Sequence, residues 1–355
     1  MRLSHLQTLN YRNLEDATVD FLPGLNVITG PNGQGKTNLL EAIYLVLTGF
    51  TEAGRLEQLV RFGQKEAYVK ATLEREDGHS VLEVGIGRGR RVQKADGLKV
   101  SAGALLRGGA VWIRPEDSEL ILGSPGGRRA FLDALLSKLS LRYASILALY
   151  ERNLAQRNAS LRSGELWALE VWNTKLSELG AEILTLRRRA VTRLSELAQN
   201  FHTGLGGGED LELKLLETTT PETYLLDLQA KRSEEVARGL TVLGPHRDDL
   251  EIVLHGVSAH TYASRGEART IALALRQAEY TLLEERHGDT PILLLDDFSA
   301  ELDPSRRQHL LSLALKSPQA IVTGTESPDA PEGSLEGVKR HFTVFGGKLA
   351  LEGRE

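Results

Sequence analysis

One eight-residue segment constrains the fold of this chain more than any other part of it. The segment is GPNGQGKT, Gly30 to Thr37, and it fits the pattern G-x-x-x-x-G-K-[ST]. A short apolar run from Leu25 to Gly30 precedes it, and a stretch typical of a helix, Asn38 to Leu47, follows it. This order of strand, loop and helix is the one in which backbone N–H groups can surround a phosphate. A glycine-rich turn without function is the alternative, and the flanking segments disfavour it.

The loop predicts where a nucleoside triphosphate and its metal would bind. Lys36 should reach the β- and γ-phosphates of ATP, and the hydroxyl of Thr37 should bind Mg²⁺. The cofactor-binding residues expected in the loop are Gly30, Pro31, Asn32, Gly33, Gln34, Gly35, Lys36 and Thr37.

A second segment supplies acidic groups for the metal. The run PILLLDD ends in Asp296 and Asp297, and its unbroken apolar part is typical of a parallel strand buried on both faces. Asp296 is expected to hold the water shell of Mg²⁺, and Asp297 to orient an attacking water molecule. We therefore expect Lys36, Asp296 and Asp297 to be catalytic, and Thr37 and Asp296 to hold the metal. Two solvated acids at the end of a strand are the alternative.

Length and composition limit the classes of protein. A chain of 355 residues exceeds what one hydrophobic core usually serves, so two lobes are expected. The 43 basic and 48 acidic residues give a net charge of −5, which argues against general coating of nucleic acid and leaves room for a local basic patch. The absence of cysteine excludes disulfides and thiolate metal sites, and fits a cytoplasmic chain. Without an apolar signal segment or a run approaching ~18 apolar residues, we expect a soluble, unprocessed protein with no membrane partner.

Periodicity divides the chain into a mixed part and a helical part. Apolar residues alternate from Glu66 to Ile86, which predicts an antiparallel hairpin with one solvated face. From Leu132 to Tyr150, and again from Trp172 to Phe201, they recur at intervals of three and four, which predicts two long amphipathic helices packed as a hairpin. We expect an α/β head with an antiparallel β subdomain, formed by residues 1–112 and 240–355, and an inserted helical lobe resembling a short coiled coil at residues 113–239.

A polar tip precedes a buried helix in HTYASRGEARTIALALRQ, His260 to Gln277. Ser264 and the backbone amides as far as Glu267 form a second helix N-terminus that can accept a γ-phosphate. Ser264 and Glu267 also have the spacing of a capping box, which is compatible with that role.

A P-loop chain with such a tip shortly before its acidic strand resembles the ABC-type P-loop ATPases. In those proteins the signature motif contacts ATP that is bound by a partner subunit. The resemblance implies that Ser264, Gly266 and Glu267 bind the cofactor across a homodimer formed on ATP. It also implies that FSAELD, Phe298 to Asp303, is the loop that crosses this interface.

Within this class the chain closely resembles the RecF recombination-repair ATPases, relatives of the SMC proteins. The resemblance covers essentially the whole chain, and its insert is short, whereas SMC proteins extend it into a long coiled coil. PEDSELILGSPGGRRAFLD and GPHRDDL are highly specific for the family, and the P-loop alone is not. The segments that carry the resemblance are NYRNL, PEDSELILGSPGGRRAFLD, LAQRNASLR, LGPHRDDL, LLLDDFSAELD and FTVFGGKL.

The resemblance implies a role in DNA replication, recombination and repair and in the SOS response. Such a protein would bind double-stranded DNA at gaps or junctions when ATP is present. With RecR and RecO it would help to load recombinase onto single-stranded DNA. An SMC-like ATPase or a transporter-type ABC subunit with another partner is the alternative function. A small-molecule P-loop kinase would have no signature tip.

The chain departs from the related patterns at three places. Many ABC ATPases carry a glutamate where this chain has Asp297, as RecF proteins do, and the shorter side chain predicts slow hydrolysis. The phosphate-sensing histidine of transporters is missing, and Thr323 or Thr325 is offered instead. The segment TGFTEAGRLE lacks the FRS-like stretch common in the family, so no phosphate or DNA contact is assigned there.

Several basic clusters are candidates for contacts with DNA phosphates. A solvated surface cluster is the alternative in each case, because charge runs usually have that role. The expected DNA-binding residues are Arg88, Arg90, Arg91, Arg128 and Arg129, and the run Arg187 to Arg189 is a further candidate.

Overall fold

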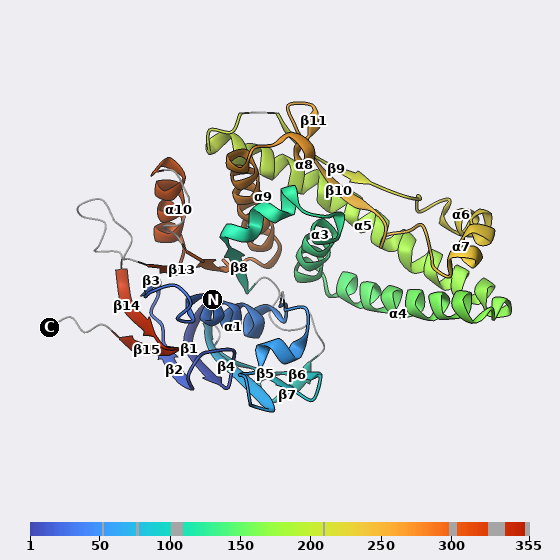
Figure 1. Cartoon of the computed structure of the whole chain (residues 1–355). Helices are drawn as coiled ribbons and strands as arrows, with labels where there is room; N and C mark the ends of the chain where they lie inside the picture. The colour runs from blue at the N-terminus through green and yellow to red at the C-terminus, as the bar shows by residue number, and fades with distance from the viewer. Residues whose placement is uncertain are drawn as a thin grey trace. The chain divides into compact units, whose positions relative to one another are not determined.

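The computed structural model describes residues 1–51, 53–75, 78–100, 109–208, 210–297, 304–325 and 338–351. Contacts divide the chain into two compact units, one of residues 1–117 and 279–355 and one of residues 118–278 (Figure 1). These boundaries differ from the expected ones at 112/113 and 239/240. Residues 240–278 pack with the helical unit, and the second boundary falls inside a helix.

The first unit contains a six-stranded, mainly parallel sheet in the order β15-β14-β3-β13-β12-β8. Its strands are β3 (Gly24–Thr29), β8 (Ala110–Ile113), β12 (Ile292–Leu295), β13 (Gln319–Gly324), β14 (Val338–Phe345) and β15 (Lys348–Leu351). β3 pairs in parallel with β13 and β14, and β12 in parallel with β13 and β8. The expected buried parallel strand is confirmed, because all four residues of β12 are at most 1% exposed.

A second, antiparallel sheet in the same unit has the order β2-β1-β4-β5-β6-β7. Its strands are β1 (Arg2–Leu9), β2 (Ala17–Asp20), β4 (Glu66–Arg75), β5 (Gly78–Gly87), β6 (Arg90–Ala95) and β7 (Leu98–Val100). The expected hairpin is β4 and β5, in which Val69 pairs with Val84 and Ala71 with Leu82. These four side chains are buried, which is the result that the alternation predicts.

Helix α1 (Lys36–Thr48) follows β3 directly and contacts strands of both sheets. Leu39, Ile43 and Leu47 are fully buried, so the helix joins the two sheets into one hydrophobic core. The expected order of strand, loop and helix is therefore confirmed. This unit also contains α10 (Pro304–Lys316), which contacts β3 and β13, the end of α9 (Arg265–His287), and the 3₁₀ turns η1 (Leu56–Leu59) and η2 (Pro115–Ser118).

The second unit is built on α4 (Leu141–Ser163) and α5 (Leu169–Gly204), which lie side by side (Figure 1). The first expected helix is wrong in one respect, because the apolar series from Leu132 to Tyr150 belongs to two helices, α3 (Pro125–Leu139) and α4. Ser140 has extended backbone, and its hydroxyl accepts the N–H of Tyr143 as the N-cap of α4. Serine favours such caps over helix interiors.

A three-stranded antiparallel sheet completes the second unit, in the order β11-β10-β9. β9 contacts α5, and β10 contacts α3. The three strands are β9 (Leu211–Leu216), β10 (Asp249–Leu254) and β11 (Val257–Ser258). The second unit also contains α2 (Glu119–Leu122), η3 (Leu166–Ala168), α6 (Tyr224–Ala230), α7 (Arg232–Arg238), α8 (Ala259–Tyr262) and the first part of α9 (Arg265–His287). Within the described ranges, none of the helices in either unit has the length and apolar character to cross a bilayer.

Candidate ATP-binding site

The loop between β3 and α1 adopts a backbone that depends on its glycines. Gly30 has a φ of 153° and Gly35 a φ of 113°. A Cβ atom on Gly30 would lie 2.3 Å from the carbonyl oxygen of Val344, and one on Gly35 would lie 2.9 Å from Oδ1 of Asn13. Both positions therefore exclude a side chain, and the loop can bring its backbone close to a ligand.

The N-terminus of α1 has the properties of an anion site. Gly35 is the N-cap, none of the described side chains caps the helix there, and the first turn has no acidic residue. N–H groups of a first turn have no partner within the helix, and the helix dipole adds partial positive charge. The phosphates of a nucleotide fit this end. A pocket of about 300 Å³ opens here, lined by Asn32, Gly33, Gly35, Lys36, Thr37, Asn38, Asp296 and Asp297.

Lys36 is 6% exposed, and its ammonium group lies inside the loop. Nζ donates hydrogen bonds to the carbonyl oxygens of Gly30 at 2.6 Å and Pro31 at 3.0 Å. Burial lowers the pKa of Lys36, and the negative charges of Asp297 and Asp296 oppose that shift. The loop thus holds a cation at the position that the motif predicts for phosphate binding.

Asp296 follows β12 and faces the start of α1. Its Oδ1 accepts hydrogen bonds from Oγ1 of Thr323 at 2.7 Å and from Oγ1 of Thr37 at 3.2 Å. Burial raises the pKa of Asp296, and the hydrogen bonds from Thr323 and Thr37 oppose that shift. Hydroxyl and carboxylate oxygens are ligands that Mg²⁺ prefers, so the pair Thr37 and Asp296 fits the expected metal.

Asp297 lines the same pocket and has an uncommon backbone for an aspartate. Its φ is 44°, in the left-handed region, and its N–H donates to Oγ1 of Thr323 at 3.0 Å. Four of the residues predicted to bind ATP and metal, Lys36, Thr37, Asp296 and Asp297, therefore lie around one pocket. The predicted interface loop, 298–303, lies outside the described residues.

Three hydrogen bonds that support the loop were not predicted from the sequence. Nδ2 of Asn13 donates to the carbonyl oxygen of Gly33 at 3.1 Å. The side chain of Gln34 accepts the N–H of Gly346 at 2.7 Å, and its carbonyl oxygen accepts the N–H of Gly347 at 3.1 Å. The segments NYRNL and FTVFGGKL, which carried the family resemblance, contain or adjoin these partners, and that was the available signal.

The two threonines offered as phosphate sensors, Thr323 and Thr325, lie in different environments. Thr323 is fully buried, and its hydroxyl contacts both acids, so its placement does not favour the expected role as a phosphate sensor. Thr325 is exposed at the end of the described segment and keeps that role as a prediction.

The predicted tip of α9 has capping-box geometry in the second unit. Oγ of Ser264 accepts the N–H of Glu267 at 3.2 Å, and Oε2 of Glu267 accepts the N–H of Ser264 at 2.8 Å. The hydroxyl and backbone N–H of Ser264 lower the pKa of Glu267. Ser264 and Arg265 are exposed, and Gly266 leaves its backbone open to an approaching group. The expected capping box is confirmed, and the contact with a partner's ATP stays a prediction.

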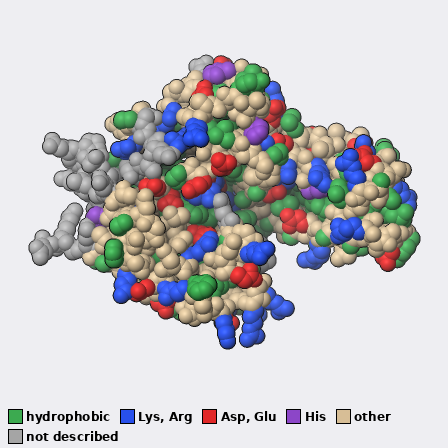
Figure 2. Space-filling model, in the orientation of Figure 1, with side chains coloured by type: hydrophobic (Ala, Val, Ile, Leu, Met, Phe, Trp, Pro, Cys, Tyr) green, Lys and Arg blue, Asp and Glu red, His purple; other side chains and the backbone are tan. Residues whose placement is uncertain are grey.

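The basic residues near the β5–β6 turn have different environments. Arg88 and Arg90 are exposed, and Lys and Arg side chains project from this edge of the unit in Figure 2. Arg91 is partly buried, and it donates to the carbonyl oxygen of Gly49 at 2.6 Å, just after α1. This hydrogen bond gives Arg91 a structural role, whereas the exposed side chains of Arg88 and Arg90 can contact a ligand.

Arg128 and Arg129 both donate hydrogen bonds to residues within the second unit. Arg128 is 5% exposed, and its guanidinium donates two hydrogen bonds of 2.8 Å to the carboxylate of Asp249. This placement does not favour the expected contact with DNA, because the guanidinium is buried and paired with Asp249. Arg129 is partly exposed and donates to the carbonyl oxygen of Asp248 at 2.7 Å.

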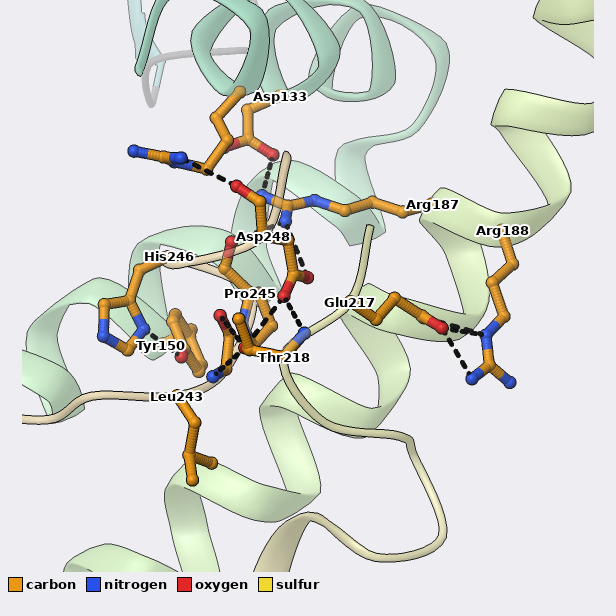
Figure 3. Close-up of polar contacts among 12 residues, drawn as sticks. Asp133, Tyr150, Arg187, Arg188, Glu217, Thr218, Leu243, Pro245, His246 and Asp248 are labelled. Atoms are coloured by element: carbon orange, nitrogen blue, oxygen red, sulfur yellow. Dashed lines mark hydrogen bonds and ion pairs between the residues drawn. The ribbon is translucent and has the colours of Figure 1, made fainter. Parts of the chain in front are cut away.

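The run Arg187 to Arg189 is also mainly structural (Figure 3). Arg187 is 1% exposed and donates to Oδ1 of Asp133 at 2.7 Å and to the carbonyl oxygen of Pro245 at 2.7 Å. Arg188 pairs with Glu217, and Arg189 is exposed. The buried Asp248 accepts the N–H of Thr218 at 3.0 Å, so this network fixes the loop that contains GPHRDDL.

Comparisons with known proteins agree with this geometry. The family described as "RecF/RecN/SMC N terminal domain" matches residues 2–332. The DNA replication and repair protein RecF of Deinococcus deserti is 60% identical over 343 residues, which are 97% of this chain and 95% of that protein. The RecF protein of Deinococcus radiodurans is 58% identical, with 97% and 96% covered.

Solved structures of RecF proteins are similar to this chain over nearly its whole length. The structure of the recombination mediator protein RecF with ATP, from the RecFOR pathway, has a TM-score of 0.91 and 31% identity, and covers 99% of this chain and 97% of that one. An SMC head bound to a ScpA domain has a TM-score of 0.55 at 18% identity and is similar in fold alone. The chain therefore has the fold of an ABC-type ATPase head with an inserted helical lobe, and it belongs to the RecF family.

Proposed function

We propose that this protein is a slow ATPase that dimerises on ATP and binds duplex DNA at gaps or junctions during recombination repair. One observation carries the proposal. The P-loop residues Lys36 and Thr37 and the acids Asp296 and Asp297 line a single pocket at an uncapped helix N-terminus. Such a pocket suits a nucleoside triphosphate with its metal.

Each residue of the pocket has a defined role in this proposal. Lys36, which now donates to two carbonyl oxygens, would bind the β- and γ-phosphates, and the backbone N–H groups from Asn32 to Thr37 would bind phosphate oxygens as well. Thr37 and Asp296 would hold Mg²⁺, which would supply positive charge to neutralise the phosphates. Asp297 orients the attacking water. Its side chain is one methylene shorter than a glutamate, which accounts for slow hydrolysis.

The tip of α9 is proposed to complete the site of a second copy. Ser264 is exposed, and Gly266 and Glu267 are partly exposed, at a helix N-terminus that would accept the γ-phosphate held by the partner's P-loop. Two such contacts related by a twofold axis would join two subunits through two ATP molecules. Hydrolysis would then weaken the dimer, because it removes the shared phosphate.

DNA and mediator proteins are the proposed partners of the dimer. The solved RecF structures come from the RecFOR pathway, so we propose RecO and RecR as the proteins with which this chain loads recombinase. Arg88 and Arg90 are our candidates for phosphate contacts, since both are exposed and the turn between β5 and β6 presents them together.

The dimer can be tested by complementation between two variants. Ser264→Arg leaves the P-loop intact and obstructs the tip, whereas Lys36→Ala removes the phosphate cation and leaves the tip intact. Light scattering with ATP should detect no dimer from either variant alone and partial dimer from their mixture, which has one complete site. Normal dimerisation of Ser264→Arg alone would reduce the tip to a helix cap and remove the proposed shared site.

The DNA contact can be tested by its dependence on salt. The association constant for duplex DNA should fall as the salt concentration rises, and each phosphate contact should add about 0.9 to the steepness of log K against log salt concentration. Replacement of Arg88 and Arg90 by glutamate should make this dependence less steep and weaken binding to gapped duplex DNA with ATP. Lys175→Glu, at an exposed lysine of α5, is the matched control and should leave the slope unchanged. Equal slopes for all three proteins would exclude the β5–β6 turn from the DNA surface.

A further inference from the structure

Thr323 lies at the carboxyl end of β13, beside the acidic end of β12. The strands are parallel with Leu295 opposite Val322, so the next residues along them, Asp296 and Thr323, are neighbours. Thr323 is fully buried and does not line the pocket around the P-loop. It therefore contacts the acids from the protein interior and not from the pocket.

The hydroxyl of Thr323 contacts both acids at once. Oγ1 donates its single proton to Oδ1 of Asp296 at 2.7 Å and accepts the N–H of Asp297 at 3.0 Å. Thr37 donates to the same oxygen, so the two hydroxyl groups together fix the rotation of the Asp296 carboxylate. The contact with the N–H of Asp297 holds Asp297 in a left-handed backbone that aspartate adopts at a cost.

We propose that Thr323 is a positioning residue for ATP hydrolysis. It orients the carboxylate of Asp296, which would hold the metal, and positions Asp297, which would orient the water. Thr323 itself would contact neither the metal nor the water. Catalytic carboxylates must be held within about 0.5 Å of their productive positions, and hydrogen bonds from buried neighbours supply that restraint. The inference rests on the proposed function of the site and assigns a role that Lys36, Thr37, Asp296 and Asp297 do not have.

The test compares Thr323→Val with Thr323→Ser. Valine has a similar shape and lacks the hydroxyl, whereas serine keeps it. Thr323→Val should bind ATP without Mg²⁺ as the wild type does, since the P-loop is unchanged. Its kcat should fall about tenfold or more, and the Mg²⁺ concentration for half-maximal rate should rise severalfold. Thr323→Ser should keep kcat within about threefold of the wild type.

A buried threonine elsewhere in the same unit provides the matched control. Thr48 is 1% exposed, donates to the carbonyl oxygen of Tyr44 at 2.6 Å and accepts the N–H of Phe50 at 3.1 Å. Thr48→Val therefore loses the same two kinds of hydrogen bond away from the acids. It should leave kcat and the Mg²⁺ requirement unchanged, so an equal loss in this variant would overturn the proposal.

Other outcomes separate this inference from the proposed function. Wild-type kcat and Mg²⁺ dependence in Thr323→Val, with hydrolysis abolished in Asp296→Asn, would overturn the role of Thr323 alone. Hydrolysis unaffected by Asp296→Asn would overturn the site itself. If Thr323→Val does not fold, as judged by circular dichroism, Thr323→Ala removes the same hydroxyl with less volume, and the same kinetic criteria apply.

Discussion

His246 makes the stability of the second unit sensitive to acid. Its Nδ1 lies 2.8 Å from the hydroxyl of Tyr150, and its Nε2 lies 3.3 Å from the carbonyl oxygen of Thr241. Burial, together with the positive charges of Arg247, Arg129 and Arg157, lowers the pKa of His246 to about 4, although the hydrogen bond with the Thr241 carbonyl opposes the shift. The folded protein therefore keeps this imidazole neutral at pH values where an exposed histidine is charged.

The magnitude follows from the two protonation equilibria. As the pH falls below about 6.5, the unfolded chain binds a proton at His246, and the folded chain does so only near pH 4. The free energy of unfolding is therefore unaffected by His246 above pH 7 and decreases as the pH falls through this window. Between pH 7 and pH 5 the loss due to this group is about 2 kcal/mol.

His246→Gln removes the titrating group and keeps an amide that can contact the same neighbours. Urea unfolding, followed by tryptophan fluorescence at pH 7 and pH 5, measures the free energy of unfolding of each protein. The wild type should lose about 2 kcal/mol more than the variant between these pH values. His260→Gln, at an exposed histidine of the same unit, is the control for the substitution and should behave as the wild type. Identical pH dependence of the wild type and His246→Gln would refute the reasoning.

Three further predictions concern the nucleotide site and the helical unit. Gly30→Ala should abolish ATP binding in calorimetry, because its Cβ would lie 2.3 Å from a backbone oxygen, whereas Gly54→Ala, at a position with open space, should bind normally. Asp297→Asn should keep ATP and lose about 100-fold or more in single-turnover hydrolysis, so that ATP-bound dimer accumulates, and wild-type hydrolysis would remove Asp297 from its role. Arg157→Met should lower the free energy of unfolding by about 3–5 kcal/mol, because it leaves the fully buried carboxylate of Glu235 unpaired, and Glu235→Gln added to it should restore part of the loss.

Local patterns predicted the elements that depend on local physics. The alternation from Glu66 to Ile86 specifies which faces of β4 and β5 are buried, because a shift of one residue would expose every apolar side chain. The P-loop was predictable for a similar reason, since Gly30 and Gly35 need conformations that only glycine adopts easily. The burial pattern of the hairpin and the backbone of the P-loop are both determined by residues that lie close together in the sequence.

Contacts between distant segments explain what the sequence analysis missed. Arg128 looks like a surface charge until Asp249, more than a hundred residues away, is placed beside it. The sequence analysis offered Thr323 only as a phosphate sensor, because its contacts with the two acids depend on the register between β12 and β13. The break at Ser140 was hidden because the apolar spacing of three and four continues through it, although the chain leaves the helix there.

The sheet order has a consequence for how this protein is made. β3, which leads into the P-loop, lies between β13 and β14, and Gln34 is held by Gly346 and Gly347. A ribosome synthesises the P-loop segment early, but the strands on both sides of it belong to residues 319–324 and 338–345. The nascent chain thus carries the nucleotide motif long before it has the pocket. Assembly of the pocket is thereby withheld from unfinished chains until residue 347 has been added.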